Sequence, residues 1–300
     1  MTREQYELTK DYQKSLEIVR KFIDEVLGGD IENLRKFCFE DLTTGDYETD
    51  FVGEIQDPDM YLITQAIYII LWGDIYDLTF ENMGSWNWDN EHAFRGDTMN
   101  SFNSVLGKMQ GNVLASRARF YDADKNPELW KKIEEFNRMY HYIGNFIVIP
   151  NRGSESNGIN GARGDYNFIR DYFDWFLILL CEYQKKLEQG NTCLNHFEKQ
   201  LQMNPEYNPE FLRIEGWEKE FFLNPYFANS SSDKREPKCF FKMPLEDRLK
   251  ITDPNGKDPN KTYFEKEEYL ELMEDYIDKS KEVIEYRTDR IIKVLKNKVF

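Results

Sequence analysis

Residues 59–72, DMYLITQAIYIILW, are apolar on nearly every face of a helix, and this stretch constrains the fold more than any other. A helix that is apolar all round is stable only where other elements cover it on every side. The Asp57-Pro58 pair directly before it is a typical helix start. The chain must therefore build a body around this helix, and its 300 residues are enough for the core that this requires.

Other segments have a single apolar face, as expected of helices that pack against a core. The predicted helices are 12–27, 127–140, 166–186, 193–203 and 209–223. Strands are few: FIVIP, at 146–150, is short and β-branched and is the best candidate, and a second short strand is predicted at 239–242.

The last predicted helix, 264–298, is long, with acidic residues at its start and basic residues at its end. This polarity suits the helix dipole. Its apolar positions approximate a heptad seam that Ser280 and Arg287 interrupt, so we expect the helix to pack on the body of the same chain. The alternative is a coiled-coil dimer.

These patterns predict a mainly α fold with a few short β-strands: a single compact helical body with a long C-terminal helix. The body comprises residues 1–228 and includes an Arg-, Gly- and Asn-rich central segment, 95–170. Residues 229–262 form a polar excursion rich in proline and glycine. Residues 263–300 form the terminal helix, packed on the body.

The formal net charge of −16 is unevenly distributed along the chain. Residues 1–94 carry 7 basic and 21 acidic side chains, whereas residues 95–170 carry 11 basic and 8 acidic ones. The arginines of the second segment are Arg95, Arg117, Arg119, Arg138, Arg152, Arg163 and Arg170. Because guanidinium groups bind carboxylate and phosphate oxygens in pairs, these arginines either bind an anionic ligand or pair with the acidic N-terminal third.

The sequence also predicts where the protein resides. No stretch reaches the roughly 18 uncharged apolar residues of a bilayer span, and the first thirty residues lack the pattern of a secretory leader. The four cysteines lie far apart and form no C-x-x-C pair, so reduced thiols and no metal site are expected. We expect a cytoplasmic protein that does not enter a membrane.

Two Arg-Gly-Asp sequences, at 95–97 and 163–165, each precede an apolar helical pattern. The aspartate can cap the helix and the glycine permits a tight turn, so a structural role explains both sequences. The alternative is an anion site beside each helix start, held by the arginine and by turn amides. Neither sequence matches a nucleotide-binding motif. The predicted ligand-binding residues are Arg95, Asn145, Asn160, Arg163 and Arg170.

His141 is one of only three histidines and lies between two tyrosines in the basic segment. A packing or helix-capping role explains it. The catalytic alternative is general acid/base chemistry by His141, acting with Asp97 or Asp171. A carboxylate metal site at Asp165, Asp171 and Asp174 is disfavoured because no acidic i+4 partner strengthens that cluster.

Three stretches carry a resemblance: IGNFIVIPN, GINGARG and IRDYFDWFLILL. There the chain resembles a family of uncharacterised bacterial proteins, a domain of unknown function. The matching positions are Ile143, Gly144, Pro150, Ile159, Asn160, Ala162, Arg163, Gly164, Asp171 and Asp174. The resemblance implies no activity. The fragment 141–145 is also similar to the end of some His-Asn-His nuclease motifs, but the Asp-His metal half is missing upstream.

The sequence supports three functions. The first is a bacterial protein that binds a nucleotide or another phosphate-containing anionic ligand, or a nucleic-acid end, through the central arginines. The second is a metal-assisted phosphodiester hydrolase with His141 as general acid/base. The third is a non-enzymatic protein-interaction subunit that uses its acidic faces and terminal helix. Neither a cofactor nor an oligomeric state follows from the sequence.

Overall fold

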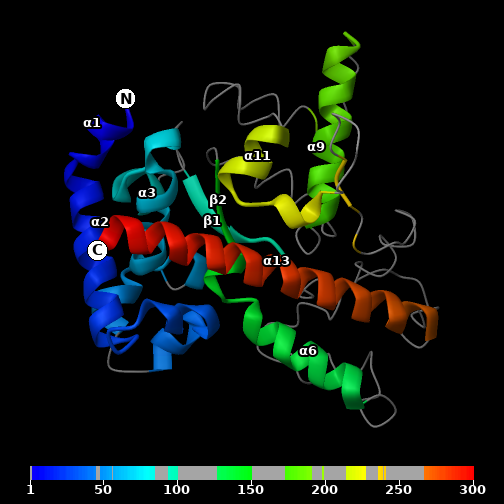
Figure 1. Cartoon of the computed structure of the whole chain (residues 1–300), viewed down its shortest axis with the longest axis horizontal. Helices are drawn as coiled ribbons and strands as arrows, with labels where there is room; N and C mark the ends of the chain where they lie inside the picture. The colour runs from blue at the N-terminus through cyan, green and yellow to red at the C-terminus, as the bar shows by residue number, and fades with distance from the viewer. Residues whose placement is uncertain are drawn as a thin grey trace.

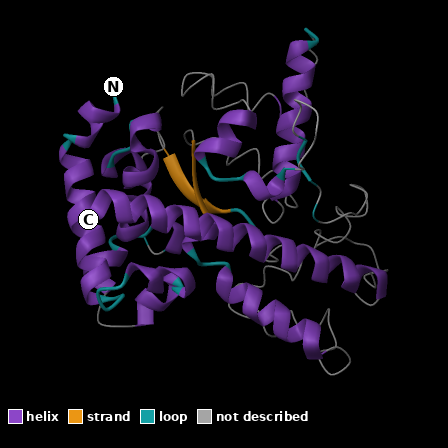
Figure 2. Ribbon diagram, in the orientation of Figure 1, coloured by secondary structure: helices purple, strands orange, loops and turns teal. Residues whose placement is uncertain are grey.

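A computed structural model describes residues 2–44, 48–55, 57–84, 94–100, 127–150, 173–190, 198, 214–227, 236–238, 240 and 267–300. The α-helices are α1 (Arg3–Glu7), α2 (Lys10–Glu25), α3 (Leu62–Tyr76), α4 (Phe80–Gly84), α6 (Pro127–Met139), α9 (Phe173–Glu188), α11 (Ile214–Glu220) and α13 (Glu267–Val299). The short 3-10 and π segments are η1 (Ile31–Lys36), η2 (Phe39–Thr44), η3 (Glu48–Val52), η4 (Pro58–Met60), η5 (Ile143–Asn145) and η6 (Asn224–Tyr226). Two strands, β1 (Phe94–Thr98) and β2 (Phe146–Pro150), pair antiparallel. Figure 2 shows this mainly helical fold, which confirms the predicted class.

Helix α3 is covered on all sides, as its sequence predicts. Every residue from Ile63 to Gly73 is buried. Helix α2 packs along it, with α1, α4 and α13 as further neighbours. The helix begins at Leu62 rather than Asp59, because residues 58–60 form the separate turn η4.

Helix α13 crosses the body and connects its parts (Figure 1). It contacts α2, α3 and α6 together with η1, η5 and η6. Near its C-terminal end, Lys296 pairs with Glu32 of η1 and Lys298 pairs with Glu7 of α1. The prediction that this helix packs on the body of its own chain is confirmed.

The sequence predicted that Ser280 and Arg287 interrupt the apolar seam of α13. Both residues lie on the buried face of this helix. Arg287 Nε donates a hydrogen bond to the Phe221 carbonyl at 2.8 Å, and Nη1 donates one to the Gly144 carbonyl. Burial lowers the pKa of this guanidinium to about 10, so it stays charged at neutral pH. We call these two hydrogen bonds the Arg287 clasp, because they hold η5 and the end of α11 to α13.

The first Arg-Gly-Asp sequence, 95–97, is the centre of strand β1, so its prediction as a turn at a helix start was wrong. Gly96 pairs with Val148 of β2. It also packs against η4, where an added Cβ would lie 2.0 Å from the Asp59 carbonyl oxygen. The glycine therefore permits close approach of η4 to the strand, rather than a tight turn.

Most other predicted elements are confirmed where the structure describes the chain. FIVIP is β2, and helices α2, α6, α9 and α11 fall within or close to the predicted ranges. The second Arg-Gly-Asp sequence lies outside the described residues, as do the predicted helix 193–203 apart from residue 198 and the predicted strand 239–242 apart from residue 240. Within the described part of the chain, no helix is long and apolar enough to cross a membrane.

The contact between η5 and α13 gives a test of this packing. At Gly144 an added Cβ would lie 2.0 Å from the Ile284 carbonyl oxygen and 2.3 Å from Thr288 Oγ1. Because helix backbone cannot rotate away as a flexible side chain can, we expect Gly144→Ala to lower the free energy of unfolding by about 3 kcal/mol.

The matched control is Gly190→Ala. Gly190 has a φ of 68° and no atom within 4 Å of an added Cβ, so only backbone strain of about 1 kcal/mol is expected. Urea unfolding of both variants measures the difference. Equal losses of stability would contradict the close contact between η5 and α13.

Candidate metal centre

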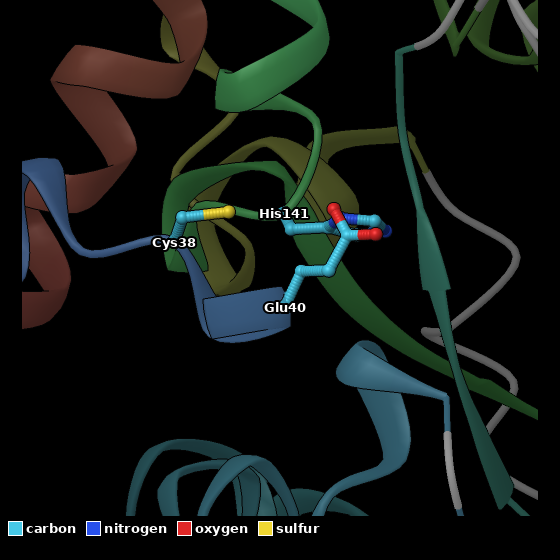
Figure 3. A group of neighbouring side chains, drawn as sticks. All are labelled: Cys38, Glu40 and His141. Atoms are coloured by element: carbon cyan, nitrogen blue, oxygen red, sulfur yellow. The ribbon is translucent and has the colours of Figure 1, made fainter. Parts of the chain in front are cut away.

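Three potential metal ligands, Cys38, Glu40 and His141, lie side by side although 101 positions separate Glu40 from His141. Cys38 directly precedes η2 and Glu40 lies in its first turn, while His141 lies between α6 and η5. The backbone N–H of Phe39 donates to the His141 carbonyl at 3.0 Å, which fixes the two segments to each other. Figure 3 shows the side chains of Cys38 and Glu40 directed towards His141.

The three side chains form a compact group. His141 Nδ1 lies 3.0 Å from Glu40 Oε2, and one ligand atom of each residue lies within 4.8 Å of the other two. The Glu40 side chain is 65% exposed and that of His141 is 16% exposed, whereas Cys38 is buried. The group therefore extends from the interior to the surface, with Glu40 on the open side.

The protonation states follow from burial. Desolvation lowers the pKa of His141, although the carboxylates of Glu40, Asp57 and Asp41 act in the opposite direction. The imidazole is therefore neutral at pH 7, the form that binds metal ions. Burial raises the pKa of the Cys38 thiol, and Asp41 raises it further. Without a metal ion this thiol is protonated at neutral pH, so it is not an activated nucleophile.

The donor set is one sulfur, one nitrogen and one carboxylate oxygen, all of which are zinc ligands. Catalytic zinc sites use three protein ligands and leave the fourth position to water or substrate. An ion at this position would replace the hydrogen bond between His141 and Glu40 and would convert the Cys38 thiol to a thiolate. Without an ion, the same geometry is a histidine–carboxylate pair beside a buried thiol.

The described arginines of the basic segment pair with acids of the N-terminal third. Arg138 Nη2 lies 2.7 Å from Asp41 Oδ2, and Arg95 Nη2 lies 3.4 Å from Asp57 Oδ2. For these two residues the predicted intramolecular pairing is confirmed. The other predicted ligand-binding arginines, Arg163 and Arg170, lie outside the described residues, as do Asn160 and Asp171.

Among the described residues, the acidic partner of His141 is Glu40 rather than the suggested Asp97, whereas Asp171 lies outside them. Asp97 lies in β1, near Asp59. Sequence analysis missed Glu40 and interpreted Cys38 only as a reduced thiol. No local spacing could have identified either residue, because their shared neighbour His141 comes from a distant segment.

Asn145 is fully buried, and its side chain joins chain segments to each other. Its amide nitrogen donates to the carbonyls of Asn100 at 2.8 Å and Tyr140 at 3.0 Å. Its amide oxygen accepts from the backbone N–H of Asn100 at 3.0 Å. This network gives Asn145 a structural role, and ligand binding by it stays a prediction.

Near this group of side chains, the buried carboxyl of Asp59 lies beside the partly exposed carboxylate of Asp57. Desolvation raises the pKa of Asp59 well above its ordinary value, and the charges of Asp57 and Asp97 raise it further. Asp59 therefore keeps its proton to a higher pH than an ordinary carboxyl group does, and a side-chain hydrogen bond with Asp57 contributes to this. Since Arg95 contacts the same Asp57 carboxylate, this carboxylate is held from two sides near His141.

No protein-family model matches the sequence, and comparisons with curated proteins and with solved structures found no match. The resemblance to an uncharacterised bacterial family therefore stays a prediction. The chemistry of the Cys38, Glu40 and His141 group has to be inferred from its own geometry.

The raised pKa of Asp59 makes stability depend on pH. The folded state binds this proton more tightly than the unfolded chain, whose carboxyl pKa is about 4. The Asp59 contribution is therefore complete below that pKa and is lost as the pH rises through the raised value. In Asp59→Asn this titration is absent, so we expect the variant to gain stability relative to the wild type between about pH 5 and about pH 8.

Urea unfolding at both pH values measures this gain. Asp24→Asn, at an exposed position on α2, is the matched control and should show little change in relative stability. A stability difference between Asp59→Asn and the wild type that is the same at both pH values would show that Asp59 does not hold the proton.

Proposed function

We propose that this protein binds a divalent transition-metal ion, with Zn²⁺ the best fit, through Cys38 Sγ, a Glu40 carboxylate oxygen and an imidazole nitrogen of His141. The observation that carries this proposal is the convergence of three different zinc donors within 4.8 Å of one another. Two of them come from η2 and the residue before it, and the third comes from the loop after α6.

The surroundings of the donors support a pre-formed site. The hydrogen bond from Phe39 N–H to the His141 carbonyl keeps the two segments together, and the ring of Tyr140 lies 4.5 Å from the imidazole. Thr43 Oγ1 donates to the Glu40 carbonyl at 2.8 Å, which stabilises the turn that presents the carboxylate. Such supporting contacts orient metal ligands and raise the affinity of a site.

Three protein ligands leave room for water or substrate, which is the arrangement of catalytic rather than structural zinc. A bound Zn²⁺ supplies Lewis acidity and lowers the pKa of its water to about 7. The proposal thus keeps the metal-assisted hydrolase among the functions suggested by the sequence, and adds ligands to it. Binding of an anionic ligand by Asn160, Arg163 and Arg170, and a protein-interaction role, stay predictions without support from the described residues.

Metal titration of the chelator-treated protein tests the proposal. We expect one equivalent of Zn²⁺ by calorimetry, and a Co²⁺ form whose ultraviolet spectrum contains the charge-transfer band of a thiolate ligand. Because the ion binds only the folded protein, a hundredfold excess over its Kd should add about 2.7 kcal/mol to the free energy of unfolding.

The ligand variants are Cys38→Ser, Glu40→Gln and His141→Ala. Each should weaken Zn²⁺ binding by at least about tenfold, because each removes one of three bonds to the ion. Cys181→Ser, at a cysteine of α9 outside the proposed centre, is the control and should bind Zn²⁺ and Co²⁺ as the wild type does. If Cys38→Ser retained both the affinity and the charge-transfer band, the proposed centre would be wrong.

A further inference from the structure

We propose that Asn145 is a positioning residue of the metal centre: its side chain fixes the backbone directly before His141 and so sets the direction in which the imidazole is presented to the ion. The inference rests on the proposed function and names a residue that does not touch the ion itself. The sequence predicted ligand binding by Asn145, and the hydrogen bonds from its side chain to backbone carbonyls favour this indirect role.

The two peptide groups that flank His141 are both held by hydrogen bonds from other parts of the chain. Before His141, the Tyr140 carbonyl accepts from the side-chain amide of Asn145 at 3.0 Å. After it, the His141 carbonyl accepts from the backbone N–H of Phe39 at 3.0 Å. A peptide group is planar and a residue has only two soft backbone dihedrals. Holding both groups therefore fixes φ and ψ of His141, and with them the direction of its Cα–Cβ bond.

The two hydrogen bonds connect His141 to different parts of the fold. Phe39 lies between the other two proposed ligands in sequence, so its N–H holds the histidine to the segment that carries them. Asn145 instead connects the histidine to the sheet. It directly precedes β2, and its backbone carbonyl accepts from the N–H of Met99, the residue after β1, at 2.9 Å. The imidazole is thus placed between the ligand-bearing segment and the sheet.

The amide of Asn145 has a single orientation that suits its neighbours. The residue is fully buried. Its nitrogen donates to the carbonyls of Asn100 at 2.8 Å and Tyr140 at 3.0 Å, and its oxygen accepts from the Asn100 backbone N–H at 3.0 Å. An amide rotated by half a turn would place oxygen against two carbonyls and nitrogen against an N–H. Because a buried polar group without a partner is costly, the observed orientation is retained.

The test is Asn145→Leu, studied by metal titration. Leucine is close to asparagine in size and cannot donate a hydrogen bond, so the peptide group before His141 loses its partner. We expect Zn²⁺ and Co²⁺ to bind about tenfold more weakly, as is typical when a group that orients a metal ligand is removed. At saturating Co²⁺ the visible d–d band should shift, because the imidazole is displaced. The charge-transfer band of the Cys38 thiolate should remain, because Phe39 still holds its own segment.

Tyr226→Phe is the matched control. It removes a hydrogen bond of 2.8 Å to the Asn100 side chain, in the same buried network, but none to the peptide groups that flank His141. The variant should be less stable to urea, whereas its metal affinity and its d–d band should remain those of the wild type. If the d–d band shifted equally in Tyr226→Phe and Asn145→Leu, any weakening of the network would disturb the centre, and the specific role of Asn145 would be overturned.

A milder variant, Asn145→Ser, is measured in the same way in case Asn145→Leu does not fold. It should weaken metal binding and shift the d–d band in the same direction, because serine is too short to replace the amide at both carbonyls. A wild-type protein that binds no Co²⁺ would remove the proposed function itself. A wild type that binds Co²⁺, together with folded Asn145 variants of unchanged affinity and d–d band, would leave the metal centre in place and overturn the positioning role.

Discussion

The Arg287 clasp is the interaction on which the rest of the structure depends. A guanidinium buried without a carboxylate partner among the described residues is costly, and the carbonyls of Phe221 and Gly144 offset part of that cost. Because both carbonyls belong to segments far from α13 in sequence, the charge can be buried only when these segments are correctly placed. The clasp thereby fixes η5, and with it the nearby His141.

A second polar network supports the same region. The side-chain oxygen of Asn100 accepts from the hydroxyls of Tyr226 at 2.8 Å and Tyr276 at 3.3 Å, and its backbone is bound by Asn145. Buried polar groups of this kind specify one arrangement, since any other would leave them without partners. The apolar core supplies most of the stability, whereas these polar contacts decide which segments meet around Cys38, Glu40 and His141.

The uneven charge distribution along the chain has a structural role: it allows ion pairs between two segments. The acidic N-terminal third folds against the basic central segment, and Arg95 and Arg138 are used in ion pairs between them. The two carboxylates of these pairs, Asp57 and Asp41, also lie near the ring of His141. An arginine cluster in sequence therefore need not form an anion site, because both arginines of this segment that the structure describes already face a carboxylate.

The sequence by itself determined the elements whose signal lies among neighbouring residues. These are the buried helix α3, the amphipathic helices, the strand FIVIP and the long terminal helix. It did not identify β1, because Arg95–Asp97 becomes a strand only by pairing with β2. Nor did it identify Cys38 and Glu40 as partners of His141, or Arg287 as a clasp. Helical and strand periodicity arise from local backbone geometry, whereas these contacts depend on how distant segments pack, which only the tertiary structure decided.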